Sequence, residues 1–246
     1  MEKQRLDRFL SNQLNISRNT VRTGIKNKMA QVNGTTVNDC TVSINVNYDV
    51  VEYCGKRVAY KKFIYLVMNK PSGIITASND KSRQTVLDLV PESLRRKGLA
   101  PVGRLDKDTT GLLILTDNGD FAHKCISPKS NIEKVYLAEL DGEINQDIIY
   151  EFANGVVLAD GYKCKPAKLQ KIDKVNVRIT VTEGKYHQIK RMFGAVGLGV
   201  NKLHREAVGG LSIPSNLKAG ECAEMTESDL NGCFADILSV LDKRPL

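Results

Sequence analysis

Hydrophobic residues near the start of the chain recur at helical spacing. The first predicted helix covers residues 5–14, because its apolar residues lie three or four positions apart: Leu6, Phe9, Leu10 and Leu14. A second helix is expected to follow Ser17, a good N-cap flanked by Ile16 and Val21 at the two positions of a hydrophobic staple. Two amphipathic helices therefore open the chain.

The pattern then changes from helical spacing to alternation. Residues 30–37 form two β-prone runs around Asn33-Gly34, which is the strongest short signal for a β-hairpin. Residues 42–53 alternate as one strand, and the charged stretch 55–62 is typical of a linker. These features predict a small helix-and-hairpin module of about 60 residues.

From residue 63 onward, strands and helices are mixed. Strands are expected over 63–68, 112–116, 134–140 and 175–181, the last being the cleanest alternation in the chain. Helices are expected from residue 117 up to Pro128, over 187–196, and over 226–241. The larger part of the chain should thus contain both a sheet and helices.

Positive charge changes the picture of the first module. The 246-residue chain has 36 Lys and Arg against 28 Asp and Glu, a net charge of +8, and half of this excess falls in the first 60 residues. Arg18, Arg22 and Lys26 recur every four residues and share one face of the second helix. That face is either an ordinary solvated surface or one that contacts nucleic-acid phosphates, with Arg5 and Arg8 of the first helix as further candidates.

Several functional classes find no support in the sequence. The six cysteines and three histidines show neither C-x-x-C nor H-x-x-x-H spacing, so neither a disulfide framework nor a zinc site is indicated. No glycine-rich phosphate loop suggests ATP or NAD binding. No apolar run is long enough for a membrane helix and no signal peptide is apparent, so we expect a cytoplasmic protein that does not bind membranes.

The richest chemistry lies in residues 103–111, a polar loop bracketed by glycines that leads into the apolar strand 112–116. Its two carboxylates, Asp106 and Asp108, could bind a metal, cap and solvate the loop, or act as a nucleophile or general base. A metal is the least favoured because no further oxygen-ligand spacing follows. Spacing alone does not distinguish Asp106 from Asp108.

Four segments together resemble the RsuA family of RNA pseudouridine synthases. They are Lys70-Pro-Ser-Gly, Gly103-Arg-Leu-Asp-Lys-Asp-Thr-Thr-Gly with the strand after it, Lys134-Val-Tyr, and Glu183-Gly-Lys-Tyr-His-Gln-Ile-Lys-Arg-Met-Phe followed by Leu203-His-Arg-Glu. Residues 1–60 are similar to the S4 RNA-binding module that precedes such enzymes. The resemblance implies an α+β protein: a small N-terminal S4 (αL-like) domain, residues 1–60, and a catalytic domain, residues 61–246, with a mixed, largely antiparallel sheet and flanking helices.

The resemblance also assigns roles within the site. Asp106 matches the catalytic aspartate, Tyr136 the active-site tyrosine, and Lys190 the basic residue that pairs with the aspartate; Asp108 matches no catalytic position. Arg104 is the candidate to fill the space that a flipped uridine leaves. RNA contacts are expected from Lys70, His187 and Arg191, and His204 is expected to be structural or to face RNA. The isomerisation needs no cofactor and no metal.

The implied activity is the conversion of one uridine of ribosomal RNA to pseudouridine. The first expectation for the partner is 16S rRNA, free or within a 30S assembly intermediate, and the protein is expected to be a monomer. Two alternatives stay open: a pseudouridine synthase that acts on 23S rRNA, and a non-catalytic S4-type factor that binds rRNA during assembly.

Overall fold

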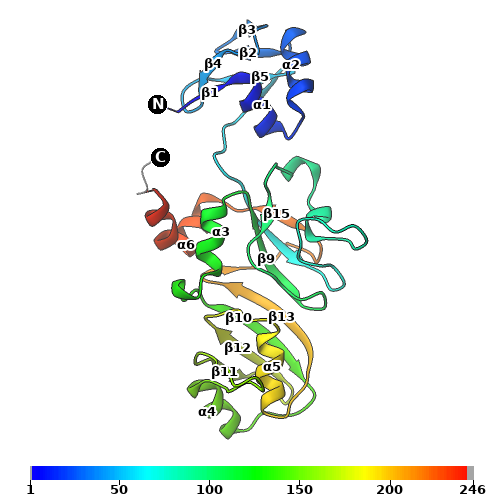
Figure 1. The fold of residues 1–246 in the computed structure, drawn as a ribbon, viewed down its shortest axis with the longest axis vertical. Coiled ribbons are helices and arrows are strands. Elements are labelled where there is room, and N and C mark those ends of the chain that lie inside the picture. Colours follow the sequence, from blue (N-terminus) through cyan, green and yellow to red (C-terminus); the bar gives the residue numbers. More distant parts are fainter. Residues whose placement is uncertain (1, 243–246) are drawn as a thin grey trace. The chain divides into compact units, whose positions relative to one another are not determined.

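The computed structural model describes residues 2–242, which divide into two compact units. The first unit extends to Ile64 and includes Glu92–Leu99, and the second comprises Tyr65–Pro91 and the chain from Ala100 onward. Figure 1 shows the elements of both units. Each unit has a sheet and an apolar core of its own, so each is described separately.

The first unit packs two helices against short strands. Its elements are β1 (Lys3–Arg5), α1 (Leu6–Leu14), α2 (Arg18–Lys26), β2 (Ala30–Val32), β3 (Thr35–Val37), β4 (Ser43–Asn45), β5 (Val51–Tyr53), β6 (Lys56–Val58) and the 3-10 turn η2 (Glu92–Leu94). Both predicted helices are confirmed, and the Ser17 hydroxyl caps α2 by accepting a hydrogen bond from the Thr20 amide at 3.1 Å. Leu10 and Ile25 are fully buried where the helices meet the strands.

Asn33 and Gly34 form the predicted hairpin turn between β2 and β3, with φ angles of +51° and +78°. The expected single strand over 42–53 is wrong, because the chain turns between β4 and β5. There the Asp49 carboxylate accepts hydrogen bonds from the Asn45 amide and the Asn33 side chain. The expected linker is wrong in part, since residues 56–58 form β6 and pair with β5.

The second unit is built on one large sheet. Its elements are β7 (Tyr65–Lys70), η1 (Val86–Leu89), β8 (Ala100–Pro101), β9 (Thr110–Thr116), α3 (Gly119–Ile126), η3 (Pro128–Ser130), β10 (Lys134–Leu140), α4 (Gln146–Asn154), β11 (Lys168–Lys171), β12 (Asn176–Val181), α5 (Gln188–Ala195), β13 (Val200–Val208), β14 (Leu211–Ser212), β15 (Cys222–Glu224) and α6 (Glu227–Asp242). The main path through the sheet runs β11-β12-β10-β13-β9-β7-β15. All these neighbours are antiparallel except β13 and β9, so the mixed, largely antiparallel sheet is confirmed.

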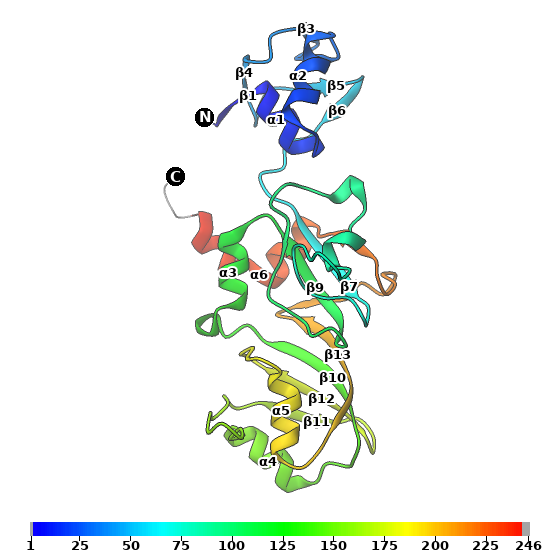
Figure 2. The same cartoon turned by 45° about the vertical axis from the view of Figure 1, so that its right-hand side comes forward.

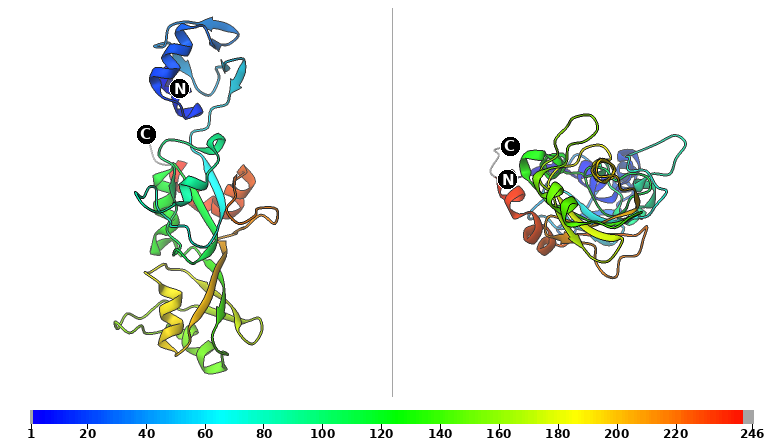
Figure 3. Two further views of the ribbon diagram at one scale, coloured as in Figure 1. Left: turned by 90° about the vertical axis from the view of Figure 1, so that its right-hand side faces the viewer. Right: turned by 90° about the horizontal axis from the view of Figure 1, so that it is seen from below.

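The parallel contact between β13 and β9 joins the two halves of the sheet, and Figure 3 shows β13 extending from one half to the other. Gly111 of β9 makes this contact possible. Its φ is +105°, and a Cβ atom there would lie 2.3 Å from the carbonyl oxygen of Arg205. A side chain at position 111 would push the two strands apart.

Helices cover the two halves of the sheet separately (Figures 1 and 2). α4 and α5 pack on β10 and β12 through Phe152 and Phe193, whose ring centroids lie 4.8 Å apart. α3 and α6 pack together beside β9, where Phe121 and Phe234 make an edge contact at 5.3 Å. Among residues 2–242, no helix is both long and apolar enough to cross a bilayer.

Candidate active site

The loop that carries Asp106 and Asp108 is fixed to neighbouring backbone on both sides of Asp106. The Thr76 hydroxyl donates to the Leu105 carbonyl at 2.8 Å and accepts from the Leu105 amide at 3.2 Å. On the other side, the Gly73 amide donates to the Lys107 carbonyl at 2.8 Å. The residues flanking Asp106 are therefore held by segments that lie about 30 positions earlier in the chain, which gives the carboxylate a defined position.

Lys70 also holds this loop, through hydrogen bonds from its ammonium group. Its side chain is fully buried, and Nζ donates hydrogen bonds to the carbonyls of Pro71, Lys107 and Thr109 at 3.0, 3.2 and 2.9 Å. Burial lowers the pKa of Lys70 to about 8, although Asp108 and Asp106 act in the opposite direction. The ammonium group of Lys70 is enclosed and bound by three backbone carbonyls, which argues against the expected contact of Lys70 with RNA.

Asp106 lies beside two residues at the start of α5. One carboxylate oxygen is 3.4 Å from His187 Nε2 and the other is 4.0 Å from Lys190 Nζ. The Asp106 side chain remains 29 % exposed, so a substrate can reach it. The structure thus brings together Asp106, Lys190 and His187, which lie about 80 positions apart in the sequence.

Lys190 binds Asp108 more closely than it binds Asp106. Its Nζ donates to both oxygens of Asp108, at 2.8 and 2.6 Å. This hydrogen bond lowers the pKa of Asp108 below its usual range. A single ammonium group therefore serves two carboxylates, and Asp108 has a partner in the site that the sequence pattern did not reveal.

The turn before α5 is anchored by a buried polar network. Glu183 and Gln188 are almost fully buried, and Gln188 Nε2 donates to Glu183 Oε1 at 2.7 Å. The same glutamate accepts hydrogen bonds from the Lys165 amide and the Tyr162 hydroxyl. This network fixes the residues between Glu183 and Gln188, including His187, next to the Asp106 loop.

Tyr136 faces a small pocket of about 100 Å³ between the two halves of the sheet. Arg104, Lys134 and Arg205 also line this pocket. The Arg205 guanidinium lies 5.9 Å from the centre of the Tyr136 ring, and its Nη1 is 3.5 Å from the Tyr136 hydroxyl. The pocket is thus an aromatic surface surrounded by cations, suited to a planar, electron-rich ring close to a phosphodiester.

Arg205 is buried and holds the floor of this pocket, a role that the sequence did not assign to it. Its Nε donates to the Leu112 carbonyl at 2.7 Å, which connects β13 to β9. Arg104, in contrast, is exposed at the rim. The expected role of Arg104 in displacing a base stays a prediction.

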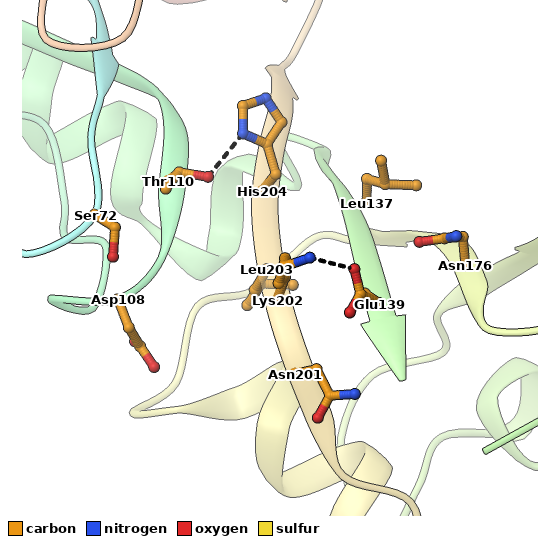
Figure 4. A pocket seen from close by; sticks show the side chains of 10 residues that line it. All are labelled: Ser72, Asp108, Thr110, Leu137, Glu139, Asn176, Asn201, Lys202, Leu203 and His204. Atoms are coloured by element: carbon orange, nitrogen blue, oxygen red, sulfur yellow. Dashed lines mark hydrogen bonds and ion pairs between the residues drawn. The ribbon is translucent and has the colours of Figure 1, made fainter. Parts of the chain in front are cut away.

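A larger cavity of about 440 Å³ lies next to the Asp106 loop (Figure 4). Leu137 and Glu139 line it, and because side chains alternate along β10 they face away from Tyr136. Across the cavity, the Thr110 hydroxyl and His204 Nδ1 form a 2.8 Å hydrogen bond. Burial lowers the pKa of His204 while Glu206 opposes this shift. His204 thus connects β13 to β9 by its side chain.

Three of the four predicted RNA-contacting arginines of the first unit converge on one buried carboxylate. Asp7 is fully buried and accepts hydrogen bonds from Arg22 Nε at 2.9 Å, from Arg18 Nη2 at 3.1 Å, and from two nitrogens of Arg5 at 3.2 Å. Burial would raise the pKa of Asp7, but the three arginines outweigh it and lower the pKa to about 2. The arginines stay 41 to 48 % exposed and outnumber the acid three to one.

The other predicted RNA contacts lie on the surface. Arg8 and Lys26 are exposed on α1 and α2, and neither contributes to the hydrogen bonds on Asp7. Arg191 on α5 is partly exposed and forms an ion pair with Asp160 at 2.5 Å. Whether these side chains bind RNA remains a prediction.

Comparison with known proteins identifies the family. Residues 64–195 match the family model described as RNA pseudouridylate synthase. The chain is 40 % identical over 232 residues to the RNA pseudouridine synthase YtzG of Bacillus subtilis, covering 92 % of this chain and 97 % of that protein. It is 38 % identical over 228 residues to ribosomal small subunit pseudouridine synthase A of Escherichia coli, covering 92 % and 98 %.

A solved structure supports the same assignment. The chain aligns with a crystal structure of a pseudouridylate synthase at a TM-score of 0.65 and 33 % identity, covering 92 % of this chain and 98 % of the other. The region matched by the family model contains the Asp106 loop, Tyr136 and the start of α5. This chain therefore belongs to the RNA pseudouridine synthase family, within which it is RsuA-like.

Proposed function

We propose that this enzyme converts one specific uridine of 16S ribosomal RNA to pseudouridine, with Asp106 as the nucleophile. The observation that carries the proposal is the geometry around Asp106: an accessible carboxylate on an immobilised loop, with Lys190 and His187 within 4.0 Å. The name of the relative from Escherichia coli supports a small-subunit substrate.

The reaction breaks the bond between uracil N1 and ribose C1′ and forms a bond between C5 and C1′. Asp106 attacks the target uridine or its ribose, the base detaches and rotates, and it rejoins through C5. The proton leaves C5 and N1 gains one, so the net change is an isomerisation. Tyr136 receives the base in the 100 Å³ pocket, and Arg104 at its rim occupies the space that the base leaves in the RNA.

The first 60 residues act as an S4-type docking module for structured rRNA. Arg5, Arg18 and Arg22 are held in place by Asp7 while much of each side chain stays exposed, so their charges are positioned before RNA arrives. Arg8 and Lys26 add mobile charges, and Arg191 and His187 contact RNA near the active site. The enzyme acts as a cytoplasmic monomer, on free 16S rRNA or on a 30S assembly intermediate.

The substrate is tested by tritium release. Transcripts of 16S and 23S rRNA and early assembly intermediates of the small subunit are labelled with tritium at uridine C5, because pseudouridine formation expels that atom. We expect release from 16S rRNA or its intermediates. Release from 23S rRNA alone would overturn the small-subunit proposal, and release from none of them would favour a non-catalytic rRNA-binding factor.

A further inference from the structure

An exposed pair of stacked aromatic rings lies beside the catalytic aspartate. Tyr186 is 77 % exposed, and its ring lies 3.8 Å from the His187 ring at an interplanar angle of 18°. The inner ring of the pair reaches the site, since His187 Nε2 is 3.4 Å from Asp106. One ring therefore touches the reaction centre, while the other is open to solvent.

The backbone holds this pair in an uncommon conformation. His187 has φ +49° and ψ +33°, the left-handed region that non-glycine residues seldom occupy. As the N-cap of α5, it makes no side-chain capping bond that would explain this geometry. Strain of this kind persists where the surrounding structure enforces it, and it is concentrated at functional sites.

The enforcing structure is the buried network on Glu183 and Gln188. Gln188 Oε1 accepts a hydrogen bond from the Lys185 amide at 2.9 Å, so the residues on both sides of Tyr186 are tied to buried groups. An exposed tyrosine on a loose loop would need no explanation. Here the backbone beside an exposed aromatic ring is anchored and the ring stacks on His187, which lowers the entropy cost of binding a flat ligand on it.

We infer that Tyr186 and His187 form a stacking platform for an unpaired nucleobase of the RNA, next to the uridine that enters the active site. A base has a π-face whatever its identity, so the free face of Tyr186 can accept any of the four. Lys185, which directly precedes the pair in sequence, supplies positive charge for an adjoining phosphate. The inference rests on the RNA pseudouridine synthase activity and not on which rRNA is modified.

The platform explains how a flipped uridine could be kept out of its helix. Once the target base leaves the stack, its neighbour loses a stacking partner as well. Tyr186 supplies a replacement surface within reach of Asp106. The phenol hydroxyl is not needed for this role, so Tyr186→Phe should behave like the wild type.

The test uses short single-stranded RNA oligomers that carry a central uridine flanked on both sides by 2-aminopurine, whose fluorescence is quenched by stacking. With the full-length protein we expect quenching on binding. Tyr186→Ala should abolish the quenching and raise Kd about 5- to 150-fold, the range measured for base–aromatic stacking. Tyr186→Phe should retain both the quenching and the wild-type Kd. Because the oligomers contain no 16S sequence, the result is independent of the 16S proposal.

Tyr150 provides a matched control, since it is 71 % exposed on α4 and away from Asp106. Tyr150→Ala should quench and bind like the wild type. On an rRNA transcript, Tyr186→Ala should raise KM with little change in kcat. The inference is overturned if the wild type gives no quenching, if Tyr186→Ala quenches normally, or if Tyr150→Ala loses as much as Tyr186→Ala.

Discussion

At the scale of single residues, the site is organised by shared charges. Lys190 contacts both Asp106 and Asp108, and Lys70 donates to two carbonyls of the loop that carries them, as well as to the Pro71 carbonyl. Asp106 and Asp108 lie two residues apart, and their carboxylates would repel each other without a nearby cation. The two lysines thus hold the Asp106 loop and the carboxylate of Asp108 in place.

Replacing Lys190 tests this sharing. Lys190→Met leaves both carboxylates without their cation, and we expect kcat for tritium release to fall at least about 100-fold. Lys190→Arg should keep more activity, because a guanidinium can donate to two carboxylates at once. Lys168→Met, an exposed lysine on β11, is the control and should leave kcat unchanged. Equal losses in the Met and Arg variants would contradict the account.

Lys70 should act on the position of the loop and not on RNA binding. Lys70→Met removes two hydrogen bonds to the loop and one to the Pro71 carbonyl while keeping a side chain of similar length. We expect kcat to fall more than about tenfold, because small displacements of a reacting group are costly, with KM nearly unchanged. If Lys70→Met raised KM alone, the result would support a contact between Lys70 and RNA, which the burial of this lysine argues against.

The sequence could not have revealed these contacts. The Arg104-Leu-Asp106 segment and the Lys134-Val-Tyr136 strand are recognisable from the sequence, and the structure places them on a loop and on β10 as predicted. The bond from Lys190 to Asp108, however, joins residues 82 positions apart, and the burial of Lys70 depends on how two loops close over it. In the sequence, Asp7 is likewise an ordinary charged residue of an amphipathic helix. Only the fold places three arginines around it.

At the scale of elements, local patterns predicted most of the architecture. The ranges expected for β10, β12, α3 and α5 agree closely with the structure because each has a clear period and a clear stop signal. The single strand predicted over 42–53 is wrong because apolar and polar residues keep alternating through residues 46–50, where the chain in fact turns. Hydrogen bonds from Asn33 and Asn45 to Asp49 turn the chain there, and such pairings are invisible to periodicity.

The junction between β9 and β13 should be the most sensitive contact between elements. Gly111→Ala places a Cβ atom 2.3 Å from the Arg205 carbonyl oxygen at a φ of +105°. We expect the free energy of unfolding to fall by more than about 2 kcal/mol, because steric strain and separated strands add. Thermal and urea unfolding of the full chain measure the loss.

Gly119→Ala is the matched control for that substitution. Gly119 begins α3, and a Cβ atom there would meet no atom within 4 Å. The control should unfold like the wild type. A Gly111→Ala variant as stable as the wild type would show that β13 and β9 can separate without loss of unfolding free energy.

At the scale of the whole molecule, the chain combines a small unit rich in arginine with the unit that matches the RNA pseudouridylate synthase family. The ion cluster on Asp7 makes the stability of the first unit depend on pH. The pKa of Asp7 is about 2 in the folded protein, against an ordinary value of 3.8, so its contribution is complete above about pH 4 and is lost as the pH falls toward 2.

We expect this contribution to reach about 1 to 2 kcal/mol at neutral pH, the size set by the pKa difference after allowance for the exposed arginines. Urea unfolding, followed by the methyl NMR signals of Val21 and Ile25, measures it between pH 2 and pH 6. Asp7→Asn should be less stable at pH 6 and show a flatter pH dependence in this range. An unchanged pH dependence would indicate that the cluster does not stabilise the fold.

The ion cluster on Asp7 limits which arginines can be replaced to test RNA docking. Replacing Arg18 and Arg22 would also unbalance Asp7, so the cleaner change is Arg8→Ala with Lys26→Ala. If both side chains bind phosphates, the slope of log Kd against log salt should decrease by about 0.7 to 0.9 for each phosphate that the variant no longer neutralises. The variant should unfold like the wild type, and an unchanged slope would count against phosphate binding by these two residues.

The central claim, that Asp106 is the nucleophile, is tested most directly by single-turnover tritium release from rRNA labelled at uridine C5. Asp106→Asn should slow release by at least about a thousandfold, whereas Asp147→Asn, an exposed carboxylate at the start of α4, should release tritium like the wild type. An Asp106→Asn enzyme that releases tritium within tenfold of the wild-type rate would contradict the account.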